Sequence, residues 1–369
     1  MADNVIKDEV KSLTAFRFIA AFYVFLFHLQ SRAPIFGDGP FGAFISEGAV
    51  GMTMFFVLSG FILTYAYDSI TLDIKSYFWN RIARIYPIYL LAAILALPWL
   101  GKELIASESV PYAIAQGLIL LIFGLLLLQA WLPQTFAFWN NGASWSISNE
   151  AFFYSMFPFA RNLMQEVSTK WLISLFIVLS MISSMIPVAS IVFDNAPESF
   201  SLWYALPFFR FPEFLCGMIA YKLMIRIEWT SAIRNTLVII LILGVTHVVI
   251  LGKLLPGYTL HNWIIIGSVA SALILLLQAE KRGSKLFTGA VPVWLGQISY
   301  CFYSFQFHVL EGLRWAIPIN EVGGLVYSVI ATFSLLIIAA VAHHFVEEPA
   351  RMWIKKRTRV FRSIERIAA

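Results

Sequence analysis

Eleven apolar segments, joined by short polar links, occupy almost the whole chain. They lie near residues 13–31, 49–67, 82–100, 113–132, 147–160, 171–191, 202–221, 236–252, 262–279, 293–316 and 324–345. Most are long enough to cross a bilayer as a helix, which takes about 20 residues. Only 13% of the residues are charged, against about 25% in soluble domains. The pattern predicts an all-α polytopic membrane protein with no room for a separate soluble domain.

The distribution of basic residues predicts the topology. Basic residues gather in four places, which is typical of cytoplasmic segments. They are the links at 222–234 and 280–285, the pair Arg81 and Arg84, and the tail at 351–369. If both termini are cytoplasmic, the number of crossings is even. Eleven is odd, so one of the eleven segments does not cross. The segment 147–160 is short and contains Glu150. We therefore expect about ten transmembrane helices plus one re-entrant or cavity-lining helix, in one domain over 1–350 followed by a basic cytoplasmic tail over 351–369.

Several classes of site have no signature in the chain. It contains no phosphate-binding GxxxxGK[ST] loop, no HExxH zinc motif and no dinucleotide fingerprint. The two cysteines lie in apolar segments without metal-ligand spacing. We expect no metal cofactor. The net charge of +5 is concentrated in links and tail and indicates orientation in the membrane, with no nucleic-acid partner.

The first apolar segment carries two ionisable residues, Arg17 and His28. They are eleven residues apart, so in a helix they share a face and are separated by about 16 Å along the axis. Ionisable residues within a span are costly and usually mark function. The structural alternative is that Arg17 extends its charged group to the lipid interface and His28 lies at the opposite interface.

Two further stretches carry polar residues in patterns that suit a site. Arg81 and Arg84 are three apart and share a helix face; they either clamp a phosphate or anchor the cytoplasmic interface. The stretch from Trp145 to Tyr154 contains Ser146, Ser148 and Glu150, and a helix would align Ser146, Glu150 and Tyr154. The structural alternative is that Ser146 or Ser148 caps the start of a helix. We treat Trp145, Ser146, Ser148 and Tyr154 as candidate substrate-binding residues and Glu150 as a candidate catalytic residue.

Three more candidate substrate-binding residues lie deep in later apolar segments. Arg210 and Glu213, at i and i+3 beside Pro212, form a binding device or neutralise each other. His308 is either a site residue or a core histidine bonded to a neighbouring helix.

These stretches together resemble the membrane acyltransferase-3 family, over nearly the whole chain. Arg17 to His28 resembles the family's arginine–histidine signature. The stretch Gly51 to Phe61 is similar to its FFVLSGF motif, with Thr53 where an acidic residue is common. The run from Arg81 to Pro87 resembles RxxRxxP, and 145–150 resembles WSLSxE. Gly296 to Tyr300 with His308 resembles a late GxxSYxxYxxH run, and Glu348–Pro349 the closing acidic–proline pair.

The resemblance implies an enzyme that transfers an acyl group, acetyl in the first instance, from acyl-coenzyme A to a hydroxyl of a carbohydrate or cell-envelope glycan. It implies that His28 is the catalytic histidine and that Arg17, Arg81 and Arg84 belong to the coenzyme A side of the site. Such an enzyme is expected in a bacterial inner membrane, in contact with membrane lipid.

The chemistry of the residues agrees with this reading. Acyl transfer to a hydroxyl needs a base such as histidine, and an acidic nucleotide donor suits arginines. The chain has no GxSxG elbow, so a serine acyl-enzyme is not indicated, while a transient acyl-histidine stays open. The alternative is a secondary transporter for a small anion or sugar. The lack of a detectable inverted repeat weighs against it.

Overall fold

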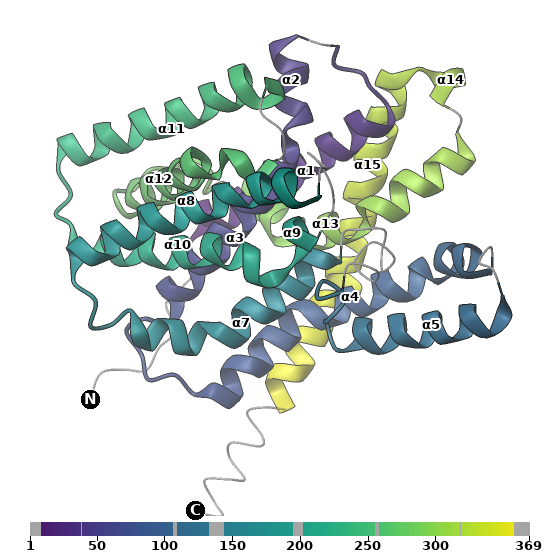
Figure 1. Ribbon diagram of the computed structural model, residues 1–369, viewed down its shortest axis with the longest axis horizontal. Helices are drawn as coiled ribbons and strands as arrows, with labels where there is room; N and C mark the ends of the chain where they lie inside the picture. The colour runs from purple at the N-terminus through teal and green to yellow at the C-terminus, as the bar shows by residue number, and fades with distance from the viewer. Residues whose placement is uncertain are drawn as a thin grey trace, which may run out of the picture.

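The computed structural model describes residues 9–37, 39–105, 109–132, 144–194, 202–254, 258–317 and 319–357. These residues form helices and connecting segments without a strand, which confirms the all-α class (Figure 1). Each of the eleven apolar segments falls on a helix: α1 (Lys11–Arg32), α3 (Gly51–Tyr67), α4 (Ile74–Ile105), α5 (Val110–Leu125), α7 (Trp145–Leu163), α8 (Thr169–Asp194), α10 (Pro207–Arg226), α11 (Ser231–Leu251), α12 (Asn262–Lys281), α13 (Ala290–Ala316) and α15 (Gly324–Ala342).

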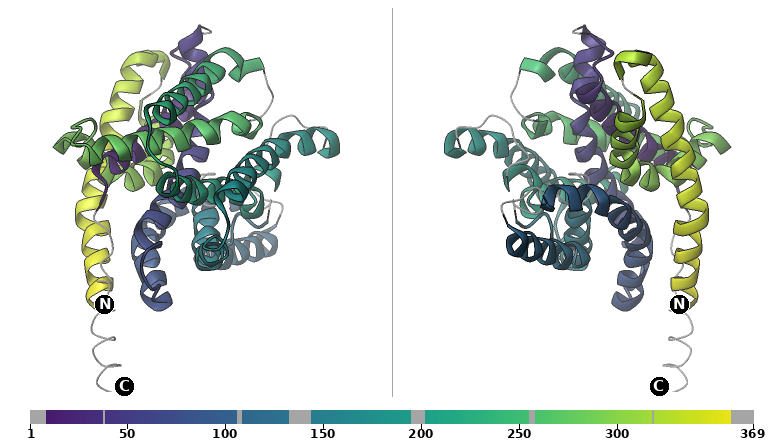
Figure 2. Two further views of the ribbon diagram at one scale, coloured as in Figure 1. Left: turned by 90° about the vertical axis from the view of Figure 1, so that its left-hand side faces the viewer. Right: turned by 90° about the vertical axis from the view of Figure 1, so that its right-hand side faces the viewer.

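The shorter elements are α2 (Pro40–Ser46), α9 (Leu202–Ala205), α14 (Ile319–Val322), three 3-10 helices (Gly48–Val50, Gly252–Leu254 and Tyr258–His261) and a π-helical turn, His343–Glu347, directly after α15. The helix continues beyond this turn to residue 357. Figure 2 shows it standing as a long column along one side of the molecule. The last residues of the basic tail, 358–369, lie outside the described part, as does most of the polar stretch before α7.

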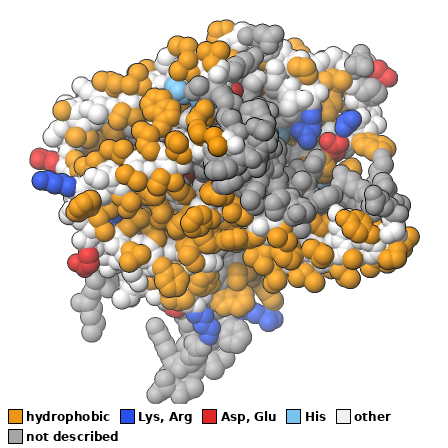
Figure 3. Space-filling view, viewed as in Figure 1, with side chains coloured by type: hydrophobic (Ala, Val, Ile, Leu, Met, Phe, Trp, Pro, Cys, Tyr) orange, Lys and Arg blue, Asp and Glu red, His pale blue; other side chains and the backbone are white. Residues whose placement is uncertain are grey.

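Six helical stretches in the described chain are long and apolar enough to cross a membrane. They are Lys11–Arg32, Gly48–Tyr67, Ile74–Trp99, Ser231–Leu251, Thr259–Lys281 and Gly324–Arg357. Hydrophobic side chains cover much of the face drawn in Figure 3, as expected for a protein in contact with lipid. These six stretches do not confirm the expected number of about ten crossings. The apolar stretches Val110–Leu125 and Thr169–Met185 are shorter, and α7, α10 and α13 carry polar residues inside their sequences.

Helix α1 packs in parallel against α13 along most of its length. The rings of Phe18, Phe22 and Phe25 surround Phe302, with centroids 5.2, 6.3 and 5.4 Å away. At the far end, Arg32 forms an ion pair with Glu311 at 3.5 Å. At the near end the two backbones touch, because a Cβ on Gly296 would lie 2.0 Å from the Thr14 carbonyl oxygen. This register fixes the face of α1 that carries Arg17 relative to α13.

Helix α7 begins in the interior and runs to one edge of the bundle. Its first ring, Trp145, packs edge-on against Phe56 in α3 at 6.1 Å. Its last turn reaches the link after α3, where Arg161 donates hydrogen bonds to the carbonyl oxygens of Asp68 and Ile70. Lys222 of α10 pairs with the Asp68 carboxylate in the same place. Helix α7 is therefore held against α3 at both ends and packs on α10 and α4 as well.

The close contact at Gly296 gives a test of the α1–α13 packing. Gly296→Ala should push the helices apart and destabilise the protein by about 1–3 kcal/mol, because the new methyl group meets rigid backbone. Gly312→Ala, on the same helix, is the matched control, since its Cβ would meet nothing within 4 Å. Thermal unfolding of the purified protein measures both. Equal melting temperatures for the two variants would contradict the packing described here.

Candidate active site

A cavity lies between α1, α3, α4, α7 and α13. We call it the chamber. Arg17, Arg81 and Arg84 reach it from two helices, and Glu150 faces it from α7. Its polar lining is completed by hydroxyl groups, and its remaining wall is apolar. The hydroxyl-bearing residues are Ser59, Ser146, Tyr154, Ser299, Tyr300 and Tyr303.

A second cavity adjoins the chamber. We call it the vestibule. The two cavities share Arg17, Arg81 and Arg84, so the arginines stand where one opens toward the other. Arg351 and His343 add basic groups from the last helix, and Glu9 and Glu348 are the acidic residues in its lining. With four arginines against two glutamates, the vestibule attracts anions.

Aromatic rings and one carboxylate hold the arginines of α4. The Arg81 guanidinium lies 5.9, 5.9 and 5.5 Å from the ring centroids of Tyr67, Tyr77 and Tyr154. Arg84 lies 5.9 Å from the Tyr300 ring and donates to Glu347 Oε1 at 2.8 Å. Cation–π contacts stabilise a guanidinium without using all of its N–H donors. Both arginines therefore keep donors for an anion in the cavities.

Polar contacts inside the chamber connect α7 to its neighbours. Ser146 Oγ and Tyr303 Oη lie 2.7 Å apart and share a hydrogen bond. Tyr154 Oη donates to Glu150 Oε2 at 2.9 Å. Glu150 interacts electrostatically with Arg84, Arg17 and Arg81. The i,i+4 alignment predicted for Ser146, Glu150 and Tyr154 is thus observed, with all three lining the chamber.

His28 lies on the same face of α1 as Arg17, three turns further along. It is half-buried and is not among the residues that line the chamber or the vestibule. Its backbone carbonyl oxygen accepts hydrogen bonds from Ser31 and Arg32 at 2.9 and 3.3 Å. Glu150 lies with the three arginines in the chamber, whose lining does not include His28.

Two candidate site residues of the 145–154 stretch, Trp145 and Ser148, lie outside these cavities. Trp145 is buried against Phe56 and Tyr204, with ring centroids 6.1 and 5.0 Å away. Ser148 Oγ donates to the Leu127 carbonyl oxygen at 2.6 Å and thereby ties α7 to the segment after α5. Both contacts hold α7 in position.

Arg210 and Glu213 pair with each other in a buried polar network. Arg210 Nε lies 2.7 Å from Glu213 Oε1, and both residues are fully buried. Asn262 donates to Glu213 at 3.0 Å and to Ser183 at 2.8 Å. Thr53 donates to Asn262 at 3.0 Å, and Tyr204 lies under the guanidinium at 4.8 Å. Neither Arg210 nor Glu213 lines the chamber or the vestibule. This arrangement agrees with the second of the two interpretations of the pair, in which the two charges neutralise each other.

His308 bonds to a neighbouring helix and lines neither cavity. Its Nε2 lies 2.8 Å from the carbonyl oxygen of Ala92 in α4, which is the core arrangement considered for it. Counted from Gly296, the GxxSYxxYxxH spacing ends at Gln306 and not at His308, so our alignment of His308 with this motif is wrong. Gln306 is buried, and its side-chain amide has no hydrogen-bond partner in the structure as described.

Sequence reasoning missed part of the lining. Ser299, Tyr300 and Tyr303 recur at three- and four-residue spacing on an otherwise apolar helix, and this polar stripe was the available signal. His343 and Arg351 carried no such signal, because they lie where the last crossing merges into the basic tail.

Comparisons with known proteins agree with this geometry. A family model described as an acyltransferase domain matches residues 10–344. Acyltransferase MdmB of Streptomyces mycarofaciens is 29% identical over 324 residues, which cover 82% of this chain and 79% of that protein. No solved structure matches the chain.

The buried network gives a test that separates a structural role from substrate binding. Glu213→Leu leaves the Arg210 charge buried without its partner, and we expect a loss of about 3–5 kcal/mol in stability. The joint variant Arg210→Met with Glu213→Leu should recover most of that loss, because no charge is left unpaired. Thermal unfolding in detergent measures both. A fully stable Glu213→Leu protein that uses its acceptor poorly would make the pair a substrate contact.

Proposed function

The chain belongs to the acyltransferase family whose domain spans residues 10–344, and from this we propose that it is an integral-membrane enzyme that transfers an acyl group from acyl-coenzyme A to a hydroxyl. Acetyl is the acyl group we expect, and a carbohydrate or cell-envelope glycan is the acceptor. We further propose a bacterial inner membrane as its location, with both termini in the cytoplasm.

One observation carries the proposal: three arginines stand at the junction of a cationic vestibule and a narrower chamber. Acyl-coenzyme A has a phosphorylated nucleotide at one end and a thioester at the end of a long arm. Arginine forks match phosphate oxygens, so the nucleotide belongs in the vestibule. The arm, with its amide groups, then enters the chamber, where hydroxyl groups alternate with apolar side chains.

The α1 helix supports a path from the arginines toward His28. Arg17 lines both cavities, and His28 continues the same face about 16 Å further along the axis. We assign to His28 removal of the proton from the attacking hydroxyl. The alternative is that its imidazole carries the acyl group briefly. Ser146, Tyr154 and Glu150 are assigned to the donor arm within the chamber, because they line it together with the arginines.

The proposed function is tested by incubating the purified full chain, in lipid nanodiscs, with radiolabelled acetyl-coenzyme A and a cell-envelope glycan fraction. Label should enter the glycan in proportion to enzyme, and release of free coenzyme A should match it. Accumulation of an intact small solute inside sealed vesicles, without label transfer, would support the transporter instead.

Replacement of His28 gives the sharpest prediction. His28→Ala should lower the transfer rate by about a hundred- to ten-thousandfold, as is typical for loss of a general base, while donor binding persists. His308→Ala is the control. It removes a hydrogen bond to Ala92 and should reduce stability more than the rate per folded molecule. Near-normal transfer by a folded His28→Ala protein would refute the assigned role.

The arginines yield a prediction about donor binding. Lysine keeps the charge but loses the two-pronged fork. Arg84→Lys should therefore raise the Michaelis constant for the donor about tenfold or more, the effect of losing a hydrogen bond to a charged group. The Michaelis constant for the acceptor should change little. Steady-state kinetics with each substrate varied in turn measures both. Donor constants unchanged in Arg17→Lys, Arg81→Lys and Arg84→Lys would leave these residues as interface anchors.

A further inference from the structure

The π-helical turn after α15 directs one carboxylate into the protein. Glu347 is fully buried, whereas His344 and Phe345 in the same turn are exposed. Single π-helical turns widen a helix locally and occur often at functional sites. Here the turn places the end of the last crossing against α4 and α13, beside the vestibule.

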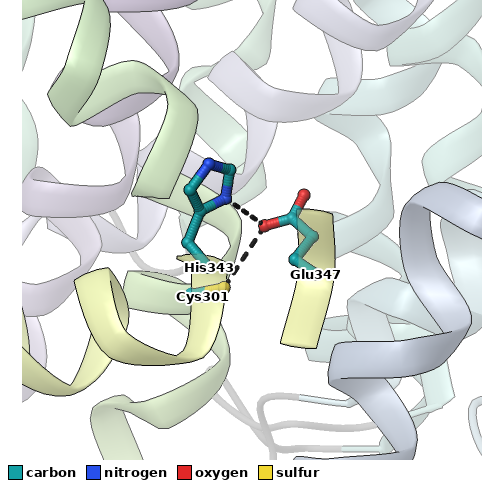
Figure 4. Close-up of side chains that lie close together, drawn as sticks. All are labelled: Cys301, His343 and Glu347. Atoms are coloured by element: carbon teal, nitrogen blue, oxygen red, sulfur yellow. Dashed lines mark hydrogen bonds and ion pairs between the residues drawn. The ribbon is translucent and has the colours of Figure 1, made fainter. Parts of the chain in front are cut away.

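Glu347 accepts hydrogen bonds from three side chains that belong to three separate elements. Its Oε2 lies 2.9 Å from His343 Nδ1 and 3.3 Å from Cys301 Sγ (Figure 4). Its Oε1 lies 2.8 Å from Arg84 Nη1. The carboxylate thus joins the π-turn, α13 and α4 at one point, and both of its oxygens are used.

Cys301, His343 and Glu347 could in principle hold a metal ion, since their ligand atoms lie within 4.8 Å of one another. The guanidinium of Arg84, bonded to the same carboxylate, opposes a cation here. The Glu347 carboxylate is therefore better suited to orienting cationic side chains toward an anion than to binding a metal ion together with Cys301 and His343.

Two of the three groups bonded to Glu347 face the vestibule: Arg84 and His343 both line it. We propose that His343 is a further phosphate-binding residue of the vestibule, and that Glu347 is the positioning residue that fixes His343 and Arg84 toward the phosphates of a nucleotide-bearing donor. This proposal rests on the proposed function and extends its donor site to the last helix.

The hydrogen bond to Glu347 determines which nitrogen of His343 can meet the donor. Nδ1 donates to the Glu347 carboxylate, so Nε2 is the nitrogen left for a phosphate oxygen. The charged groups that share the vestibule with His343 are Glu9, Arg17, Arg81, Arg84, Glu348 and Arg351.

Calorimetric titration of the purified full chain with coenzyme A tests the role of His343. His343→Gln should weaken binding about tenfold, the effect of a lost bond to a charged group. His344→Gln is the matched control, because His344 is the exposed neighbour in the same turn and lines neither cavity. It should bind as the unmodified protein does.

A double-mutant cycle tests the positioning role of Glu347. Glu347→Gln and Arg84→Lys should each weaken coenzyme A binding, and the combined variant should be weaker than either by clearly less than the product of the two effects. A merely structural Glu347 would lower the melting temperature and give multiplicative effects. If Glu347→Gln does not fold, the His343→Gln and His344→Gln comparison decides alone.

Different results contradict the proposed donor and the proposed role of His343. If the unmodified protein binds no coenzyme A, the proposed donor is wrong. If it binds coenzyme A and His343→Gln matches His344→Gln in affinity, only the role of His343 is overturned.

Discussion

The structure depends on how it accommodates arginine charge inside an apolar helical body. A buried guanidinium costs free energy unless charge and hydrogen bonds compensate it. Arg210 is compensated fully, by Glu213 at 2.7 Å and by aromatic rings around it. Arg81 and Arg84 are compensated partly, by rings and by one carboxylate, while their remaining donors face cavities. That difference separates a closed structural network from a site open to an anionic ligand.

Helix packing determines where these arginines lie relative to the chamber and to His28. Because α1 and α13 run in parallel with their backbones in contact at Gly296, Arg17 is held level with Ser299 and Tyr300 at the chamber wall. The same parallel register carries the face of α1 onward to His28. Helix α7 enters from the interior and ends at the link after α3, so Ser146 and Glu150 stand between the aromatic core and the arginines. One set of contacts thus places the arginine-lined vestibule, the chamber and His28 in order along α1.

The last helix contributes more than an anchor. Glu347 connects the π-turn to α4 and α13 through Arg84 and Cys301, and its neighbours His343 and Arg351 line the vestibule. The last helix therefore lines a cavity that Glu9 and Arg17, near the beginning of the chain, line as well.

The sequence by itself determined the helical class, the position of all eleven apolar helices and the residues that share a helix face: Arg17 with His28, Arg81 with Arg84, and Ser146 with Glu150 and Tyr154. It could do so because length and hydropathy fix a helix in lipid, and i,i+3 or i,i+4 spacing fixes a shared face. The tertiary structure brought Arg17, Arg81, Arg84 and Glu150 to one chamber. Only the tertiary structure decided which charges pair. Arg210 and Arg84 look alike in sequence, yet the partner of one is three residues away and that of the other is in the last helix. Contacts between residues distant along the chain set that choice, and no local pattern in an apolar helix encodes them.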